Sequence, residues 1–279
     1  MRVKKVKEET KQLVKKWKEQ GFSIGFVPTM GALHSGHIEL IKKSRLSNDK
    51  TICSIFVNPL QFNRKEDLDN YPNTIETDLN MLEKEGCDLV FMPDATAFYD
   101  GVQALTFDFG ILGETMEACQ RPGHFEGVAA VIDEFFRVLM PTRAYFGEKD
   151  FQQLAVIKWL VKNQNFSVEV VGCETVRAES GLALSSRNLR LSDEGRAVGT
   201  KIYEALNYCR TYKNAKSSQQ MIERAMSILK EEFEVEYFEI VDEKTFQRVD
   251  NLDNCASPRA FVAAHLEGIR LIDNLSLNP

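Results

Sequence analysis

The segment VPTMGALHSGHIEL, residues 27 to 40, gathers the side chains best suited to chemistry. Gly31 and Gly36 permit a tight backbone, and His34 and His37 stand three residues apart where a helical pattern begins. Imidazoles at this spacing can face the same way and donate hydrogen bonds to a phosphate at the helix N-terminus. Two alternatives stay open: the histidines only cap and pack, or they begin a zinc site, for which a nearby third ligand is missing.

Two later segments, GEKD at 147 to 150 and GLALSSRN at 181 to 188, add cationic and hydroxyl groups. Taken alone, GEKD is typical of a surface turn at a helix start. A nucleotide phosphate that reacts develops charge on its oxygens, so cations and N–H donors are needed around the phosphorus. The candidate catalytic groups are His37, His34, Lys149 and Arg187, with the hydroxyls of Ser185 and Ser186 beside them.

Five sequence blocks follow one another along the chain: PTMGALHSGH at 28 to 37, FVNPLQFN at 56 to 63 followed by YP, RPGHFEGVAAVI at 121 to 132, YFGEKDFQQLAVI at 145 to 157 and GLALSSRN at 181 to 188. In this order they resemble the blocks of the pantoate–β-alanine ligase (pantothenate synthetase) family of the HxGH nucleotidylyltransferase superfamily. An HxGH motif by itself indicates only nucleotide handling, but five blocks over roughly 160 residues make a chance resemblance improbable.

The resemblance implies the ATP-dependent condensation of (R)-pantoate with β-alanine to pantothenate, AMP and pyrophosphate, through an enzyme-bound pantoyl adenylate. This reaction belongs to vitamin B5 and coenzyme A biosynthesis. By resemblance His37 is the proton donor, a role that suits an imidazole because imidazoles titrate near neutral pH. The ATP-binding residues that the resemblance implies are Met30, Gly31, Ala32, Leu33, His34, Ser35, Gly36, His37, Gly147, Glu148, Lys149, Asp150, Val176, Leu184, Ser185, Ser186 and Arg187.

Two glutamines are the expected ligands of pantoate. An amide offers a donor and an acceptor together, which the hydroxyls and carboxylate of pantoate require. In the family the glutamines at the positions of Gln61 and Gln153 bind pantoate, and the first also contacts β-alanine. Without the resemblance, Gln61 would be a loop residue in solvent and Gln153 an exposed helical position. Further candidates for the same pocket are Asn58, Tyr71 and Arg121.

Magnesium is expected because ATP is normally used as its Mg²⁺ complex, which proteins hold through one or two carboxylates and the phosphate oxygens. Asp78 fits an acidic helix position of the family and is the candidate ligand. The alternative is that the segment TIETDLNMLEKEG simply needs polar residues on its solvated face.

Short apolar runs and helical patterns alternate in the first half of the chain, as in βαβ units. We predict a Rossmann-like, doubly wound α/β fold with a parallel sheet and helices on both faces. Ligands bind such sheets at the carboxyl edge, where the histidine segment falls. The expected strands are 23–28, 51–57, 88–93, 143–146 and 167–172, and the expected helices are 37–46, 74–86, 126–140 and 150–164.

The composition changes near Thr175, where a polar, serine-rich stretch begins. Two helical stretches follow, and then the segments 234–242 and 259–273 alternate like antiparallel strands. We therefore expect two domains: residues 1–174 as a Rossmann-like domain that binds nucleotide and pantoate, and residues 175–279 as a smaller α+β lid domain.

Charge and composition favour small-molecule partners. The net charge of −6 gives no general reason to bind nucleic acid, and no apolar stretch of eighteen residues predicts a membrane span. The basic segment 1–20 shows helical spacing and is expected to be an amphipathic helix. Six cysteines without a C-x-x-C pair are consistent with a reducing cytoplasm. The resemblance also implies a homodimer.

Two other functions stay open from the sequence. The first is a related adenylyl- or cytidylyltransferase, or a small synthetase-like protein acting on tRNA, although the acidic balance disfavours tRNA. The second is a catalytically inactive α/β protein that serves as a binding scaffold, because a fold alone does not determine function.

Overall fold

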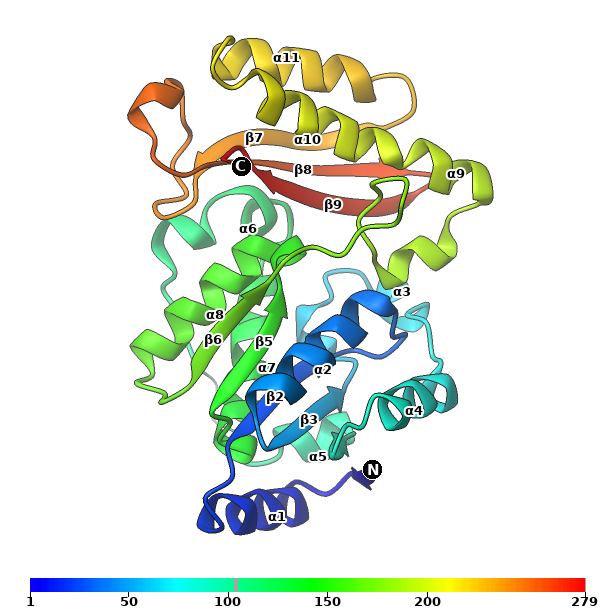
Figure 1. The fold of residues 1–279 in the computed structure, drawn as a ribbon, viewed down its shortest axis with the longest axis vertical. Coiled ribbons are helices and arrows are strands. Elements are labelled where there is room, and N and C mark those ends of the chain that lie inside the picture. Colours follow the sequence, from blue (N-terminus) through cyan, green and yellow to red (C-terminus); the bar gives the residue numbers. More distant parts are fainter. Residues whose placement is uncertain (103–104, 279) are drawn as a thin grey trace. The chain divides into compact units, whose positions relative to one another are not determined.

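The computed structural model describes residues 1–102 and 105–278. In this part of the chain six strands form one parallel sheet in the order β1-β4-β3-β2-β5-β6 (Figure 1). The Rossmann-like α/β prediction is confirmed. The strands are β1 (Arg2–Lys4), β2 (Ile24–Thr29), β3 (Lys50–Ile55), β4 (Leu89–Phe91), β5 (Arg143–Gly147) and β6 (Glu169–Cys173).

Strand β1 is the element of this sheet that the sequence did not predict. It lies in the basic segment 1–20, of which only the later part is helical, as α1 (Lys7–Glu19). Three residues carry too little alternation to indicate a strand, and β1 forms because its backbone pairs with β4. The helix buries Thr10, Val14 and Trp17 on one face, in agreement with the predicted amphipathic pattern.

Helices cover both faces of the sheet, as Figure 1 shows. On one face α2 (Ser35–Ser47) and α4 (Ile75–Lys84) pack on an aliphatic cluster that includes Val27 and Cys53. On the other face α7 (His124–Leu139) brings Phe135 to Phe26 of β2, with ring centroids 5.3 Å apart. Side chains alternate between the two faces along a strand, so the sheet contributes apolar side chains to the core on both faces. Residues 1–174 also form the helices α3 (Lys65–Asp69), α5 (Ala95–Tyr99) and α8 (Phe151–Asn163), with 3-10 turns η1 (Pro59–Gln61) and η3 (Glu148–Asp150).

The strand order reverses direction at β2. This strand pairs with β3 on one side and with β5 on the other, and the next strands of the chain continue outward on both sides. In open α/β sheets, ligands bind outside the carboxyl ends of the strands at such a reversal. The turn with His34 and His37 follows β2, while Gly147 ends β5 and Glu148 follows it.

The chain divides into two compact units. The first consists of residues 1–109, 121–148 and 152–174, and the second of residues 110–120, 149–151 and 175–279. The predicted domain boundaries and the lid role of residues 175–279 stay predictions.

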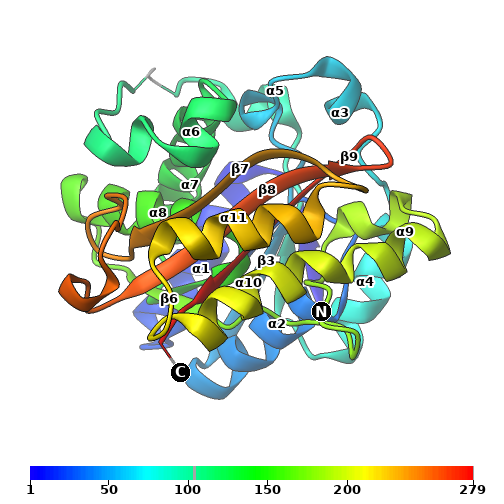
Figure 2. The same cartoon turned by 90° about the horizontal axis from the view of Figure 1, so that it is seen from above.

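The second unit contains a three-stranded antiparallel sheet in the order β7-β8-β9, as predicted. The expected run 259–273 is divided between two strands, because Glu267 and Gly268 both adopt positive φ (52° and 72°) and form a two-residue hairpin turn. Helices α10 and α11 lie side by side on one face of this sheet (Figure 2) and bury Leu206, Met221 and Val262 with it. The strands are β7 (Glu234–Asp242), β8 (Pro258–Leu266) and β9 (Ile269–Ser276); the helices and 3-10 turns are η2 (Gly110–Gly113), α6 (Met116–Gln120), η4 (Ser186–Arg190), α9 (Asp193–Val198), α10 (Thr200–Tyr212), α11 (Ser218–Leu229) and η5 (Leu252–Asn254).

Among the described residues, no helix has the length and hydropathy that a membrane span requires.

Candidate functional site

The turn between β2 and α2 has an uncommon backbone. Gly31 and Ala32 both lie in the left-handed region, with φ of 84° and 49°. Glycine is required at the first position for a second reason, because a Cβ there would lie 3.2 Å from both Asp78 Oδ2 and the Ile55 side chain. Thr29 Oγ1 accepts a hydrogen bond from the Gly31 N–H and fixes the exit from β2. The sequence predicted the tight turn from its glycines, but not the positive φ of Ala32.

A buried carboxylate from α4 holds this turn. Asp78 is 1% exposed, and its Oδ2 and Oδ1 accept hydrogen bonds of 2.9 Å from the backbone N–H groups of Ala32 and Leu33. Thr74 Oγ1 donates a third hydrogen bond to Asp78 Oδ1 at 3.0 Å. Within the described residues no group of three acidic, histidine or cysteine side chains is arranged to hold a metal ion. The assignment of Asp78 as a magnesium ligand stays a prediction.

The two histidines cap the start of α2 through one nitrogen each. His34 Nδ1 accepts the Gly36 N–H at 3.1 Å, and His37 Nδ1 accepts the His34 N–H at 3.3 Å. The ring centroids are 4.1 Å apart. A nitrogen that accepts a hydrogen bond carries no proton, so each neutral ring carries its proton on Nε2. Capping and phosphate binding are therefore compatible, because the caps use Nδ1 and a phosphate would be met by Nε2–H.

Gln61 is half-buried and hydrogen-bonded to its neighbours, not a side chain in solvent. It lies in η1, which three residues separate from the end of β3, and its Nε2 donates to Met30 Sδ at 3.2 Å. Its Oε1 accepts a hydrogen bond of 3.1 Å from Asn58 Nδ2. Asn58, 1% exposed, also donates to the Gly127 carbonyl and accepts from the Tyr99 hydroxyl and the Leu60 N–H. These four hydrogen bonds use the whole capacity of the Asn58 amide.

The block RPGHFEG positions the backbone of η1. Arg121 donates to His124 Nε2 at 3.0 Å, so the His124 proton lies on Nδ1, which donates to the Gln61 carbonyl at 2.9 Å. Gly127 lets η1 approach α7, since a Cβ there would lie 2.4 Å from the Leu60 oxygen. Sequence reasoning did not name His124, Tyr99 or Gly127 as site residues. The first and last stand in a block that the family resemblance singled out, so the motif held a usable signal.

A cavity of about 510 Å³ lies in the first unit beside the histidine turn. That volume lies within the usual range for small-ligand sites, roughly 300–1,000 Å³. Five predicted site residues lie around it: Met30, Gly31, Ala32, Tyr71 and Asp78. The rest of its lining consists of Lys5, Ile55, Phe56, Val57, Leu68, Pro72, Asn73, Thr74, Ile75, Met92, Pro93, Asp94 and Ala95.

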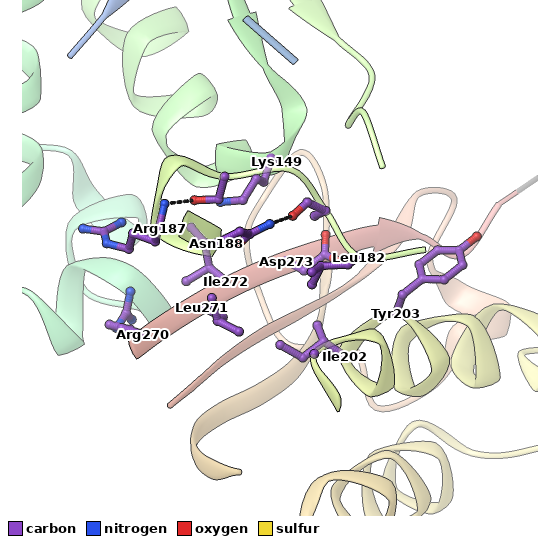
Figure 3. Close-up of a pocket in the computed structure, with 13 residues that line it drawn as sticks. Lys149, Leu182, Arg187, Asn188, Ile202, Tyr203, Arg270, Leu271, Ile272 and Asp273 are labelled. Carbon is purple, nitrogen blue, oxygen red and sulfur yellow. Dashed lines mark hydrogen bonds between the residues drawn. The ribbon is translucent and has the colours of Figure 1, made fainter. Parts of the chain in front are cut away.

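The second unit brings together a different group of predicted residues. Lys149, Ser185 and Arg187 line one small pocket, with Ile202 and Tyr203 of α10 on its other side (Figure 3). Its cavity volume is about 20 Å³. A cavity of roughly 10–15 Å³ is needed for one water, so this pocket as it stands has room for about one water molecule and none for a nucleotide.

Hydrogen bonds between side chains and backbone groups fix the segments that form this pocket. The side-chain Nδ2 of Asn274 donates to the Lys149 carbonyl at 2.8 Å, and Ser185 Oγ accepts the Arg187 N–H at 3.3 Å. The Leu184 N–H donates to the Val176 carbonyl at 3.0 Å, which joins two more of the predicted ATP residues in one hairpin. Asp150 lies in η3 and Ser186 in η4. The other predicted residues lie in the first unit: Leu33, Ser35, Gly36, Gly147, Glu148 and Gln153.

An ion cluster adjoins the pocket through Arg270 of β9. Its guanidinium donates to both oxygens of Glu117 at 2.7 and 2.8 Å and to Glu236 at 2.7 Å. Burial would raise the pKa of Glu236, but hydrogen bonds from Arg270 and His265 lower it below its ordinary value. Burial and the neighbouring Glu117 raise the pKa of Tyr237, whose hydroxyl donates to Glu117 at 2.8 Å. Arg270 is therefore neutralised by carboxylates and is no candidate for a phosphate ligand.

Comparisons with known proteins agree on one family. Residues 2–276 match the family model described as pantoate-beta-alanine ligase. A pantothenate synthetase of Cytophaga hutchinsonii is 45% identical over 264 residues, which are 92% of this chain and 93% of that protein. The crystal structure of pantothenate synthetase from Thermus thermophilus is 39% identical, with a TM-score of 0.93 and full coverage of both chains.

A third relative was solved with ligands. The pantoate-beta-alanine ligase of Francisella tularensis, in a crystal structure complexed with beta-gamma ATP and beta-alanine, is 33% identical with a TM-score of 0.83. The alignment covers 100% of this chain and 98% of that one. Matches of this length and identity leave one conclusion: the chain belongs to the pantoate–β-alanine ligase family.

Proposed function

We propose that this chain condenses (R)-pantoate with β-alanine at the expense of ATP, giving pantothenate, AMP and pyrophosphate. In the first step a pantoate carboxylate oxygen bonds to the α-phosphorus of ATP and pyrophosphate leaves. In the second step the β-alanine amine bonds to the acyl carbon of pantoyl adenylate, and AMP leaves with the bridging oxygen. Membership of the family and the ligands of the Francisella tularensis relative support this reaction.

The single observation that carries the proposal is the histidine turn. His34 and His37 stand at the start of α2, at the carboxyl end of β2, and each neutral ring has its N–H on Nε2. Fixed N–H donors and a helix N-terminus stabilise the charge that develops on phosphate oxygens without reorganising during the reaction. His37 is the proposed proton donor, and Lys149 and Arg187 are the proposed cations around the triphosphate.

Pantoate is proposed to bind through Gln61 and Gln153. The Gln61 amide is supported on both ends, by Met30 and by Asn58, which lowers the entropy that is lost when substrate binds. Asn58 has no donor or acceptor to spare in this arrangement, so a direct contact with substrate would require it to give up a present bond. Tyr71 and Arg121 remain candidates for the same pocket.

ATP is proposed to enter as its Mg²⁺ complex, which neutralises part of the triphosphate charge. The fit of Asp78 to a Mg²⁺ ligand is poor, because its carboxylate is 1% exposed and already accepts three hydrogen bonds. Mg²⁺ commonly keeps several waters and binds through phosphate oxygens, so it does not require a protein cluster. In the proposed reaction Asp78 therefore has no role as a metal ligand.

We further propose a cytoplasmic homodimer in which residues 175–279 act as a lid. The described cysteines are all free thiols, which supports a reducing compartment. Light scattering during size-exclusion chromatography would measure the oligomeric state. A mass of about 32 kDa, that of one chain, would contradict the dimer.

Isotope exchange between pyrophosphate and ATP tests the proposed reaction. Label should move from pyrophosphate into ATP only when pantoate is present, and pantothenate should form only after β-alanine is added. Exchange that is independent of pantoate would favour a related nucleotidylyltransferase. If saturating ATP, pantoate and β-alanine yield neither AMP nor pantothenate, the chain is an inactive scaffold.

A further inference from the structure

We propose that Asp78 is a positioning residue, which sets the proton position and orientation of His37 through the turn that precedes α2. The inference rests on the proposed function of the histidine turn. It assigns to Asp78 a role other than metal binding, and it links a residue of α4 to the imidazole 41 positions earlier in the chain. Each link lies within the first unit.

Hydrogen bonds to three successive backbone N–H groups of one turn, those of Ala32, Leu33 and His34, connect the two residues. Asp78 accepts the N–H groups of Ala32 and Leu33, at 2.9 Å each, on its two separate oxygens. These N–H groups point toward α4 only because Gly31 and Ala32 adopt positive φ. The same turn delivers the next N–H, that of His34, to His37 Nδ1 at 3.3 Å. The last bond places the proton of a neutral His37 on Nε2.

The turn needs an external anchor because its conformation is unfavourable on its own. A left-handed conformation suits glycine but is strained for an alanine, whose Cβ crowds the backbone. Such strain persists only when the surrounding structure over-determines it. The charge-assisted hydrogen bonds from two adjacent N–H groups to one carboxylate supply that constraint, and burial strengthens them.

The arrangement explains why an acid is needed at this position. A carboxylate presents two acceptors to two N–H groups, whereas an asparagine of the same shape would turn an NH₂ group toward one of them. Asp78 borders the cavity, but it is only 1% exposed and both of its oxygens already accept hydrogen bonds from the turn or from Thr74, which leaves little capacity for a metal ion. The third hydrogen bond, from Thr74 at 3.0 Å, orients the carboxylate and provides a milder site for mutation.

The decisive variant is Asp78→Asn, measured with Asp133→Asn as its matched control. Asp133 is also a buried helical carboxylate, 2% exposed, and is bonded to Arg137 outside the histidine turn. We expect Asp78→Asn to lower kcat by about tenfold or more while the KM for pantoate changes by less than about threefold, as expected for a group that acts on the transition state. Asp133→Asn should lower the melting temperature and leave kcat within about twofold.

Magnesium activation separates positioning from metal binding. If Asp78 positions the turn, the Mg²⁺ concentration for half-maximal activity is the same in Asp78→Asn and the wild type. If excess Mg²⁺ restores the activity of the variant, Asp78 is a metal ligand and the proposal is overturned. An unchanged kcat in Asp78→Asn would also overturn it. If Asp78→Asn does not fold, Thr74→Val should show a smaller loss of kcat in the same direction, and no loss would contradict the proposal.

A second substitution tests the role of strain. Replacing Ala32 by glycine lowers the cost of positive φ, so Asp78→Asn with Ala32→Gly should recover part of the kcat that Asp78→Asn loses. A purely additive pair of effects would argue against the proposed link.

Nuclear magnetic resonance provides a readout that does not depend on activity. Two-bond ¹H–¹⁵N spectra show which ring nitrogen carries the proton, and the chain has only four histidines to assign. In the wild type His37 should carry it on Nε2, and Asp78→Asn should mix the two tautomers. A wild-type His37 protonated on Nδ1 would overturn the inference even if the enzyme makes pantothenate. A correct tautomer without pantothenate formation would instead reject the proposed function alone.

Discussion

The two groups of predicted nucleotide ligands are held in place by different physical means. In the first unit the histidine turn is organised by backbone N–H groups, imidazole Nδ1 atoms and the single carboxylate of Asp78. In the second unit the walls around Lys149 and Arg187 are organised by ion pairs, including Arg177 with Asp273 and Arg270 with Glu117. The histidine turn thus holds neutral N–H donors in fixed orientations. Around Lys149 and Arg187, by contrast, lie other arginines whose charge is neutralised by carboxylates.

This difference predicts how the two regions respond to mutation. Hydrogen bonds to a backbone turn determine where an N–H points, so their loss should affect catalysis more than stability. A buried ion pair determines whether the fold tolerates its charges, so removing one partner should affect stability first.

His37→Ala should give the largest loss of activity. We expect adenylate formation to fall by about tenfold to a thousandfold, because a donor to the transition state is removed. The melting temperature should change little, since the His34 ring still caps the helix start. Pyrophosphate exchange and thermal unfolding measure the two quantities. His265→Gln, outside the histidine turn, is the control, and equal losses in both variants would contradict the assignment.

Asp273→Asn should act mainly on stability. Asp273 is 3% exposed and Arg177 15%, and the two are joined by bonds of 2.5 and 2.9 Å. Breaking a buried pair by removing one partner costs about 3–5 kcal/mol, which denaturant titration would reveal. The double variant Arg177→Met with Asp273→Leu should regain most of that loss. An equally unstable double variant would mean that packing, and not the uncompensated charge, dominates.

Gln153→Ala should mainly raise the KM for pantoate. Loss of a neutral hydrogen bond costs about 0.5–1.5 kcal/mol, which corresponds to a rise of about twofold to tenfold. The KM for ATP and kcat should change much less, because this contact contributes uniform binding. Gln164→Ala, at the end of α8, is a matched control. Near-normal pantoate kinetics in Gln153→Ala would remove the residue from the site.

The smallest effect concerns acid stability through Glu236. Its pKa lies below the ordinary value of 4.5 in the folded chain, although burial alone would raise it, because Arg270 and His265 donate to the carboxylate. Its contribution to stability is therefore complete above the ordinary value and is lost as the pH falls through the lowered one. Glu236→Gln should lower the melting temperature at neutral pH and flatten its decline in acid. A decline as steep as that of the wild type would contradict this role.

The sequence predicted what repeats along the chain and missed what depends on distant contacts. Apolar runs such as 51–57 and 88–93 indicated β3 and β4, because buried parallel strands are nearly continuous in hydrophobicity. The strand β1 was missed since three residues carry no periodicity. Long-range pairing, and not local propensity, makes it a strand.

The site residues also divide into those that a local pattern predicts and those that depend on distant contacts. His34, His37 and Gln61 could be named because their motifs are contiguous in the chain. The hydrogen bonds of Asp78 to the turn could not be predicted, because the partners are 45 and 46 residues apart and meet only after the sheet and α4 have packed. The RPGHFEG block singled out the segment of His124, but the role of this residue could not be predicted, because its partner is the backbone oxygen of Gln61, which carries no residue-specific signal.

Transfer of oxygen from pantoate to AMP shows whether pantoate is activated as an adenylate. Pantoate labelled with ¹⁸O in both carboxylate oxygens would be incubated with the wild-type chain, ATP and β-alanine, and the products would be analysed by mass spectrometry. We expect one ¹⁸O in AMP, one in the amide carbonyl of pantothenate, and none in pyrophosphate. Label in inorganic phosphate, or AMP that contains no ¹⁸O, would contradict activation of pantoate as an adenylate.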